Sequence, residues 1–153
     1  MVNITYVSGN ESLFDRIQPL WDKLNCHLHT VSPYFKEYFQ TLTFQERKKA
    51  ILQRAWGGGI HVDLAYDDMA LVGYCVSSFD KVLTGEIDSI FVEAKYRRQG
   101  IGTALMRKAL SWLNSSGAKK NIISVTVGNE QTYGFYEKFD FHPRRTMLEQ
   151  KKQ

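Results

Sequence analysis

The sequence predicts an α/β or α+β domain built on a mixed sheet, and three observations predict it. Apolar residues recur every three to four positions between residues 12 and 56, which is typical of amphipathic helices. Alternating and β-branched runs between residues 60 and 93 are typical of strands. Helix and strand patterns then alternate up to residue 148, so the predicted order is β-α-α-β-β-β-α-β-α-β.

Length and composition limit the class of protein. The 153 residues correspond to one domain, 1–153, with 43% hydrophobic and 24% charged residues, which excludes extensive disorder. No run of 18 apolar residues occurs, so we expect no transmembrane helix, and the N-terminus does not resemble a secretory signal. Cys26 and Cys75 have no metal or redox spacing. They favour a reduced, cytoplasmic compartment.

The predicted N-terminal elements are a short strand and a helical region. The strand covers 3–7, and a helix over 12–29 could be capped by Ser12. A second helical segment opens at Ser32-Pro33. Thr43-Phe44-Gln45-Glu46 resembles a capping box for a further helical piece that runs to about Trp56.

The rest of the chain alternates between strand and helix patterns. Asp67-Asp68 separates two strand patterns and predicts a hairpin. The predicted elements are strands 60–66, 70–79 and 84–93, a basic loop 94–100, a helix 101–115, a strand 121–127, a short aromatic helix 130–139 and a last strand 141–148.

Charge is distributed unevenly along the chain. Residues 1–80 hold 7 basic and 9 acidic side chains, whereas residues 81–153 hold 13 and 7. A basic half suggests an anionic partner, which could be a nucleic acid, a membrane surface or a phosphorylated cofactor. A solvated basic face is the alternative, and charge alone does not decide between them.

A glycine-containing turn between the strand 84–93 and the helix 101–115 predicts an anion site. The first-turn amides of a helix have no intrahelical partners and carry the positive end of the helix dipole. Gly100 and Gly102 remove side chains where a phosphate would approach these amides, and Arg97 and Arg98 add charge. These features predict an anion-binding turn, apparently for a pyrophosphate. The segment matches neither a Walker A loop nor a dinucleotide-binding fingerprint.

Two motifs resemble those of the GCN5-related N-acetyltransferase (GNAT) superfamily. Arg97-Arg98-Gln99-Gly100-Ile101-Gly102 follows a strand ending Ile90-Phe91-Val92, as in the family's acetyl-CoA-binding motif. The segment from Asn129 to Phe141, which contains Gly134-Phe135-Tyr136-Glu137-Lys138, is similar to its second signature. Asp140 stands where the family usually has glycine, and aspartate tolerates positive φ better than most residues.

The resemblance implies a mostly antiparallel sheet of six to seven strands flanked by about four helices. It also implies that the pantetheine arm of acetyl-CoA lies along the fourth strand and that its pyrophosphate binds the amides that follow. Asn129 resembles a coenzyme-contacting asparagine, although it could simply cap the next helix. The residues expected to bind acetyl-CoA are Ile90, Phe91, Val92, Arg97, Arg98, Gln99, Gly100, Ile101, Gly102, Thr103, Asn129, Tyr133 and Tyr136.

Three residues are catalytic candidates by the same resemblance. Tyr136 resembles the family's tyrosine near the coenzyme sulfur, and a phenol can protonate a departing thiolate. Its alternative role is aromatic packing. Glu86 and Asp88 share a strand face by period two, and Glu86 lies six residues before Val92, where several members place a catalytic glutamate. Either acid could instead only bind a cationic substrate.

The expected function is transfer of an acetyl group from acetyl-CoA to a primary amine by direct attack in a ternary complex, with no metal. Its amine acceptor could be a small molecule or a protein, and a homodimer is compatible with the family. Two alternatives remain open: a catalytically idle coenzyme-A-binding module and a basic nucleic-acid-binding module. No nucleic-acid-binding signature occurs in the sequence, so neither nucleic acid nor membrane is an expected partner.

Overall fold

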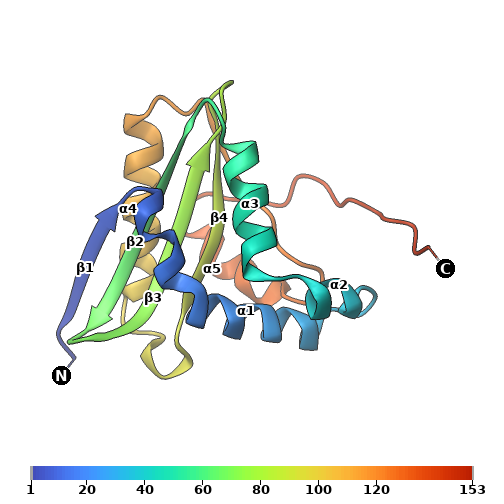
Figure 1. Cartoon of the computed structure of the whole chain (residues 1–153), viewed down its shortest axis with the longest axis horizontal. Helices are drawn as coiled ribbons and strands as arrows, with labels where there is room; N and C mark the ends of the chain where they lie inside the picture. The colour runs from blue at the N-terminus through green and yellow to red at the C-terminus, as the bar shows by residue number, and fades with distance from the viewer. Residues whose placement is uncertain (1, 153) are drawn as a thin grey trace.

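The structure is a computed structural model that describes residues 2–152, and these contain one five-stranded sheet with the order β1-β2-β3-β4-β5 (Figure 1). Only β4 and β5 are parallel, and every other neighbouring pair is antiparallel. The predicted α/β fold on a mixed, mostly antiparallel sheet is therefore confirmed. The strands are β1 (Ile4–Gly9), β2 (Gly59–Asp67), β3 (Ala70–Phe79), β4 (Thr84–Val92) and β5 (Lys120–Ile123).

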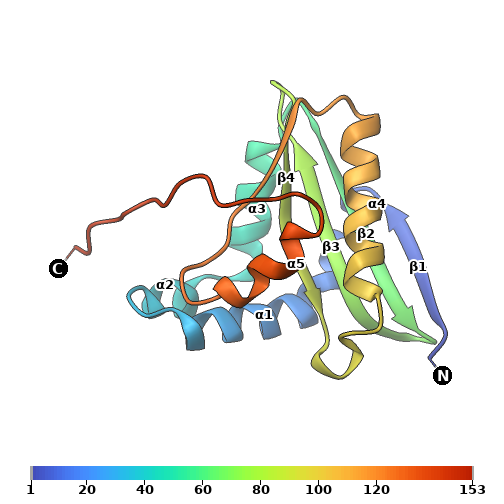
Figure 2. The ribbon, with the colours of Figure 1, turned by 180° about the vertical axis from the view of Figure 1, so that it is seen from behind.

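Helices cover both faces of the sheet (Figures 1 and 2). One face is covered by α1 (Gln18–Val31), α2 (Lys36–Thr41) and α3 (Phe44–Arg54). The other is covered by α4 (Ile101–Ser115) and the short α5 (Tyr133–Glu137). Among the described residues, no helix combines the length and apolar character needed to cross a membrane.

Each face of the sheet has its own apolar core. Phe14, Trp21 and Phe44 pack edge to face beneath α1 and α3. On the opposite face, fully buried Leu105 and Met106 of α4 pack against the sheet. Alternation of side chains along β2 and β3 supplies both cores, because successive residues of a strand point to opposite faces.

The predicted helix 12–29 is divided in two. Residues Glu11–Ile17 form a 3₁₀ helix, and α1 begins only at Gln18, with Pro19 in its first turn. Proline has no N–H to donate and is tolerated only at a helix start, so the α-helix begins there. Asn10, and not Ser12, caps the first segment, since its side chain accepts a hydrogen bond from the Ser12 N–H.

The capping box predicted at residues 43–46 is confirmed. Thr43 Oγ1 accepts a hydrogen bond from the Glu46 N–H at 3.1 Å and opens α3. Because α2 is a separate short helix, three α-helices lie between β1 and β2, where the predicted order has two.

Strands β4 and β5 pair over four residues only, from Thr84 opposite Lys120 to Ile87 opposite Ile123. The predicted strand 121–127 therefore ends early. The next residue of β4, Asp88, is a bulge: Ser89 lies opposite Val76 and Ile87 opposite Ser77, which leaves Asp88 without a partner on β3. A bulge bends the strand and increases its twist, so β4 turns away from β5 at this point.

The predicted C-terminal elements are partly wrong. The helix 130–139 is reduced to a 3₁₀ turn, Glu130–Thr132, followed by α5. The predicted last strand, 141–148, does not form: residues 141–152 have no regular structure and leave the body of the molecule (Figure 1). A strand exists only beside a hydrogen-bonded neighbour, and this segment has none among the described residues. Five strands are therefore present there instead of six to seven.

Gly128 is expected to be essential for joining the end of β5 to α1. Its φ is +103°, and an added Cβ would lie 2.1 Å from the Val31 carbonyl oxygen. The change Gly128→Ala should lower the free energy of unfolding by about 1–2 kcal/mol from backbone strain alone, measured by urea denaturation. Gly134→Ala is the matched control, because nothing lies within 4 Å of its Cβ position. Equal stability of the two variants would contradict this role of Gly128.

Candidate active site

A large cleft opens where β4 turns away from β5, with a volume of about 1080 Å³. Side chains from α1, α2 and Leu42 form one wall, and β5, the following loop and α5 form another. The predicted site residues that line it are Glu86, Asp88, Ile90, Phe91, Val92, Arg97, Arg98, Gly100, Gly102, Thr103, Asn129 and Tyr136. Three predicted residues, Gln99, Ile101 and Tyr133, are not part of the lining, and the Ile101 side chain is buried in the core.

The N-terminus of α4 faces this cleft with its amides uncapped. Gly100 is left-handed, with a φ of +83°, and no side chain caps the helix start within the described residues. The first helical hydrogen bond runs from the Ala104 N–H to the Gly100 carbonyl, which leaves the preceding amides without helical acceptors. A Cβ on Gly102 would touch the Phe135 ring at 3.4 Å, so the space above this turn is narrow.

Arg97 fastens this loop to the strand instead of pointing only at the anion site. Its Nε donates a hydrogen bond to the Val92 carbonyl at 2.8 Å, and its guanidinium lies 5.3 Å from the centre of the Phe91 ring. Arg98 also lines the cleft and has a φ of +63°. The sequence predicts the same role for both arginines, whereas in the structure Arg97 also contacts the end of β4 directly.

The outer half of β4 has no strand beside it on the cleft side, although the backbone carbonyls of Asp88 and Val92 accept hydrogen bonds from Arg47 and Arg97. Residues 88–92 have no partner on the β5 side, because that pairing ends at Ile87. Their other edge is paired with β3. An unpaired strand edge presents alternating N–H and C=O groups that can bind an extended, amide-containing ligand.

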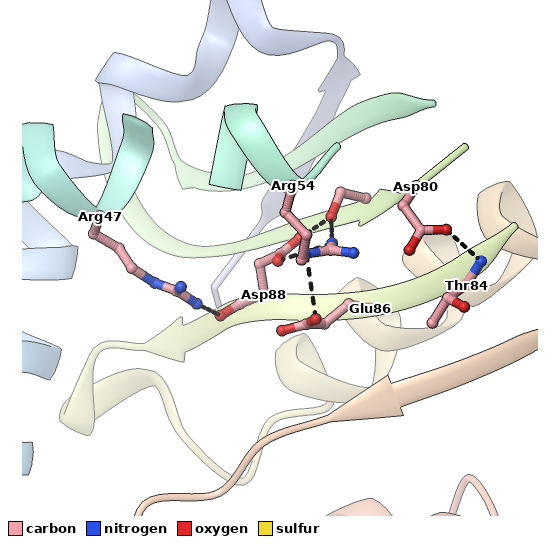
Figure 3. Close-up of polar contacts among 7 residues, drawn as sticks. Arg47, Arg54, Asp80, Thr84, Glu86 and Asp88 are labelled. Carbon is pink, nitrogen blue, oxygen red and sulfur yellow. Dashed lines mark hydrogen bonds and ion pairs between the residues drawn. The ribbon is translucent and has the colours of Figure 1, made fainter. Parts of the chain in front are cut away.

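Glu86 and Asp88 form one cluster with Arg54 of α3 (Figure 3). Arg54 Nε lies 3.4 Å from Glu86 Oε1, and Arg54 Nη2 lies 3.3 Å from Asp88 Oδ1. The Ser78 hydroxyl donates to Asp88 Oδ2 at 2.5 Å and also contacts Arg54. The two carboxylates therefore share one guanidinium, as period two along β4 predicts for residues on the same face.

Arg47, also from α3, completes the cluster. Its Nη2 donates a hydrogen bond to the backbone oxygen of Asp88 at 2.9 Å, at the bulge where the β3–β4 ladder is interrupted (Figure 3). Sequence reasoning missed both arginines, because they precede the acids by 41 and 34 positions. Their spacing on α3 was the only signal, since residues seven apart return to the same side of a helix.

Burial separates the two acids. The Asp88 side chain is 1% exposed and that of Glu86 is 15% exposed. Burial raises the pKa of Asp88 from 3.8 to about 6, with a contribution from the neighbouring Glu86 charge, against the lowering effect of the Ser78 hydrogen bond and the arginines. Asp88 is therefore positioned to support Arg54, and Glu86 is the acid more accessible from the cleft.

Tyr136 lines the cleft from α5, and its ring packs edge to face on Phe135. Burial raises the pKa of Tyr136 to about 12, so the phenol is protonated at neutral pH and can donate a proton or a hydrogen bond. The structure thus shows a packed ring at the cleft, and the role of the Tyr136 hydroxyl as a proton donor stays a prediction.

Asn129 does not cap the helix that follows it, because its side chain makes no cap hydrogen bond. Its Oδ1 lies 3.1 Å from His27 Nε2 and accepts from Gln131 at 2.5 Å. His27 lies in α1 and lines the cleft. Within residues 2–152, no group of three or more His, Cys, Asp or Glu side chains could hold a metal ion.

Titration of Asp88 is expected to make stability fall as pH rises. Between 3.8 and about 6 the unfolded chain has lost this proton and the folded protein retains it, so the folded state binds more protons and stability decreases with pH across that window. Asp88→Asn should flatten this part of the pH dependence, measured by thermal unfolding. Asp22→Asn on α1 is an exposed control. Identical profiles for wild type and Asp88→Asn would contradict the raised pKa.

Comparisons with known proteins agree with this geometry. Residues 24–141 match the model of the acetyltransferase (GNAT) family. An uncharacterized N-acetyltransferase of Methanocaldococcus jannaschii is 32% identical over 72 residues, which are 47% of this chain and 32% of that protein. The N-alpha-acetyltransferase 30 of Schizosaccharomyces pombe is 29% identical over 51% of this chain and 55% of that protein. The matches thus span about a third to a half of the length of these curated relatives.

Solved structures share the fold over nearly the whole chain. A protein assigned as an acetyl transferase from Pyrococcus furiosus superposes with a TM-score of 0.75 and 25% identity, covering 97% of this chain and 99% of that one. An aminoglycoside N-acetyltransferase solved with CoA has a TM-score of 0.66 at 15% identity, over 100% and 97% of the two chains. With the family model matching most of its length, the chain belongs to the GNAT family of acetyltransferases.

Proposed function

We propose that the protein transfers an acetyl group from acetyl-CoA to a primary amine by direct attack in a ternary complex. The observation that carries the proposal is the convergence of four features on one cleft: the uncapped start of α4, the free edge of β4, the acid cluster and Tyr136. A ternary complex gains rate by holding both reactants in one geometry, without a covalent enzyme intermediate.

The residues present fit the coenzyme. The amides after Gly100 and the open space at the Cβ position of Gly100 suit a pyrophosphate, which is anionic and approaches backbone closely. The unpaired edge of residues 90–92 suits the amide-rich pantetheine arm. Acetyl-CoA supplies the activated acetyl group, and a backbone N–H of β4 near Phe91 that faces the cleft would stabilise the negative charge that develops on the acetyl oxygen.

Glu86 is the proposed general base. An amine near pKa 10 is mostly protonated at pH 7 and must lose a proton before it attacks. Glu86 lines the cleft and is more exposed than Asp88, so it can accept this proton directly or through a water. Arg54 orients Glu86, and Tyr136 would protonate the departing thiolate.

The acceptor end of the cleft favours an amine on an apolar body over a polycation. Glu86 and Asp88 already share Arg54, and Arg47 also lines this region, so little negative charge remains for several ammonium groups. Trp21, Leu24, Phe39 and Leu42 supply an apolar wall. A panel of amines, assayed by release of free coenzyme thiol, would rank single-amine and polyamine acceptors.

Coenzyme binding is testable at Gly102. Acetyl-CoA at a hundredfold excess over Kd should stabilise the wild type by about 2.7 kcal/mol in a thermal-shift assay. Gly102→Val should weaken binding by about 10–100-fold, since charge-assisted hydrogen bonds contribute about 1.5–3 kcal/mol each. Ser115→Val, exposed at the far end of α4, is the control. Absence of any acetyl-CoA shift in the wild type would refute the proposed function.

The role of Tyr136 is testable by removing only its hydroxyl. Tyr136→Phe keeps the ring that packs on Phe135, so the protein should fold and bind acetyl-CoA normally. We expect kcat to fall by up to about 10²–10⁴-fold, the usual contribution of general acid catalysis, with water recovering part of it. An unchanged kcat when chemistry limits the rate would leave Tyr136 with a packing role alone.

The role of Glu86 is testable with Glu86→Gln, which keeps the shape and removes the basicity. The value of kcat/KM should fall by about 10²-fold or more at pH 7 and recover partly at higher pH, as free amine becomes available. Asp88→Asn is the matched control on the same strand face, and it should lose less. If the loss at Glu86 appears only in the acceptor KM, Glu86 anchors the cation; a larger loss at Asp88 would transfer the role there.

A further inference from the structure

Arg47 is a cation of the cleft whose donors are mostly unused. Its side chain is half-buried and lines the cleft. A guanidinium carries five N–H donors, and within residues 2–152 the Arg47 side chain makes one hydrogen bond, from Nη2 to the Asp88 backbone oxygen at 2.9 Å. No ion pair joins Arg47 to a carboxylate of the described chain. Most of its donors are therefore available to a ligand.

Arg54, about two turns further along α3, has the opposite arrangement (Figure 3). It pairs with Glu86 at 3.4 Å and with Asp88 at 3.3 Å. The Ser78 hydroxyl donates to the other oxygen of Asp88, so the Asp88 carboxylate is bound by groups other than Arg47. Arg54 thus compensates the two acids, whereas Arg47 touches only the backbone beside them.

The charges at this end of the cleft already balance when both acids are ionised. Glu86 and Asp88 contribute two negative charges, and Arg47 and Arg54 contribute two positive ones. An acceptor that carries only an ammonium group would bring an uncompensated charge into a partly buried site, which is unfavourable. An acceptor that also carries a carboxylate adds no net charge. The balance therefore favours a zwitterion.

The proposed base and the Arg47 guanidinium lie close to one another along β4. Arg47 is bound at Asp88, two residues after Glu86, and two residues of a strand span about 6.5 Å. In an α-amino acid the amino and carboxylate groups are joined through a single carbon. One such molecule can therefore place its amino group beside Glu86 and its carboxylate beside Arg47.

The wall that α1 and α2 contribute to the cleft is apolar. Trp21, Phe39 and Leu42 line it, and the first two are almost fully buried. Within residues 2–152, neither α1 nor α2 adds a Lys, Arg, Asp or Glu side chain to the lining. Such a wall suits an apolar side chain on the acceptor, and it strengthens an ion pair at Arg47 by lowering the local dielectric constant.

The two walls of the cleft touch one another at one place. His27 Nε2 of α1 lies 3.1 Å from Asn129 Oδ1, in the loop after β5. In the same loop, Gly128 packs so closely on the end of α1 that a Cβ would collide with the Val31 carbonyl. A polypeptide acceptor needs a groove that stays open where its chain leaves the site. The bridged cleft therefore suits a small molecule better than a polypeptide.

We propose that the acceptor is a free α-amino acid with an apolar side chain, whose carboxylate binds the Arg47 guanidinium while its amino group faces Glu86. This inference rests on the proposed acetyl transfer and names its substrate class. Arginine recognises a planar carboxylate through two parallel N–H donors, which a lysine cannot offer. Arg47 is then the residue that selects amino acids from other amines.

Acetyl transfer to such an acceptor leaves the carboxylate unchanged. The amino nitrogen forms a bond to the acetyl carbon, and the carbon–sulfur bond of acetyl-CoA breaks. Of the two protons that the ammonium nitrogen loses, one passes through Glu86 to solvent, and the other replaces the proton that Tyr136 gives to the sulfur. The products are the N-acetyl amino acid and coenzyme A. Because the Arg47 contact is the same before and during the reaction, it should lower the acceptor KM and leave kcat nearly unaffected.

The experiment compares L-leucine and L-phenylalanine with their carboxamides, which keep the amine and lose the carboxylate. Release of free coenzyme thiol measures acetyl transfer. The wild type should have a kcat/KM about 10–100-fold higher for each amino acid than for its amide, the effect of one charge-assisted contact. As a second measurement, L-leucine should raise the Tm of the protein with coenzyme A bound, and leucinamide should not.

Three variants test the assignment to Arg47. Arg47→Gln should reduce the ratio of amino acid to amide to about one, and this ratio is not altered by a general loss of activity. Arg47→Lys keeps the charge without the planar pair of donors, so it should retain an intermediate ratio. Lys49→Gln, an exposed position on α3, is the matched control and should keep the wild-type ratio.

Four results would overturn the inference. A wild type that acetylates the amides as well as the amino acids would do so and leave the proposed function standing. A preference for carboxylates that survives in Arg47→Gln would place their binding site elsewhere. Faster transfer to a peptide that begins with leucine than to leucine itself would assign the cleft to polypeptide N-termini. Transfer to none of these acceptors would also overturn it, and the acetyl-CoA thermal shift of the wild type then decides whether the proposed function falls as well.

Discussion

The separation of β4 from β5 after Ile87 is the constraint on which the rest of the site depends. Up to that point, the two strands pair in parallel and close the sheet. Beyond it, the bulge at Asp88 redirects β4, and the space between the strands becomes the cleft. The start of α4 and the helix α5 both reach this space, because each follows one of the two diverging strands in the chain. One backbone irregularity thus brings together a candidate anion site, an unpaired strand edge and the three catalytic candidates.

The same bulge explains the arrangement of the acids. A buried carboxylate next to another carboxylate is unfavourable unless cations and hydrogen bonds compensate. Asp88 obtains Ser78 and Arg54 for its side chain and Arg47 for its backbone oxygen. Glu86 shares Arg54 but keeps more exposure. The pair therefore acts as a unit, in which the buried member fixes the guanidinium and the exposed member faces the cleft.

Local signals in the sequence predicted most of the elements up to β5, whereas coenzyme binding at the predicted residues stays a prediction. Helix periodicity, the Thr43 capping box and the glycines at 100 and 102 act within a few residues, so a single sequence contains them. Pro19, in the first turn of α1, is also a local signal for the start of this helix. The helical pattern that begins earlier in the sequence obscured that signal. Ten of the twelve predicted residues that line the cleft belong to the segments of the coenzyme motif and the second signature, and the other two are Glu86 and Asp88. Gln99, Ile101 and Tyr133 lie in the same motifs but do not line it, because periodicity turns their side chains elsewhere.

What the sequence did not contain is information about partners that are distant in the chain. In the sequence, Arg47 and Arg54 look like ordinary surface residues of an amphipathic helix. Their contacts with the acids arise only because α3 packs over β4. The length of β5 is set by where β4 bends, and no residue after Ile123 signals that end. The residue types at 141–148 do favour an extended strand. A strand forms, however, only beside a neighbour that donates and accepts backbone hydrogen bonds. Within one copy that neighbour is missing.

The short strand β5 also influences the cleft. β5 contributes only four residues to the sheet and has one hydrogen-bonded neighbour, and such a short edge strand is held mainly by the side chains around it. The residues that continue from it, up to Thr126, form the wall opposite β4. Any strand that pairs with the outer edge of β5 would restrain this wall, because backbone hydrogen bonds on both sides fix a strand more firmly than those on one. The width of the cleft therefore depends on how firmly β5 is held as well as on the bulge at Asp88.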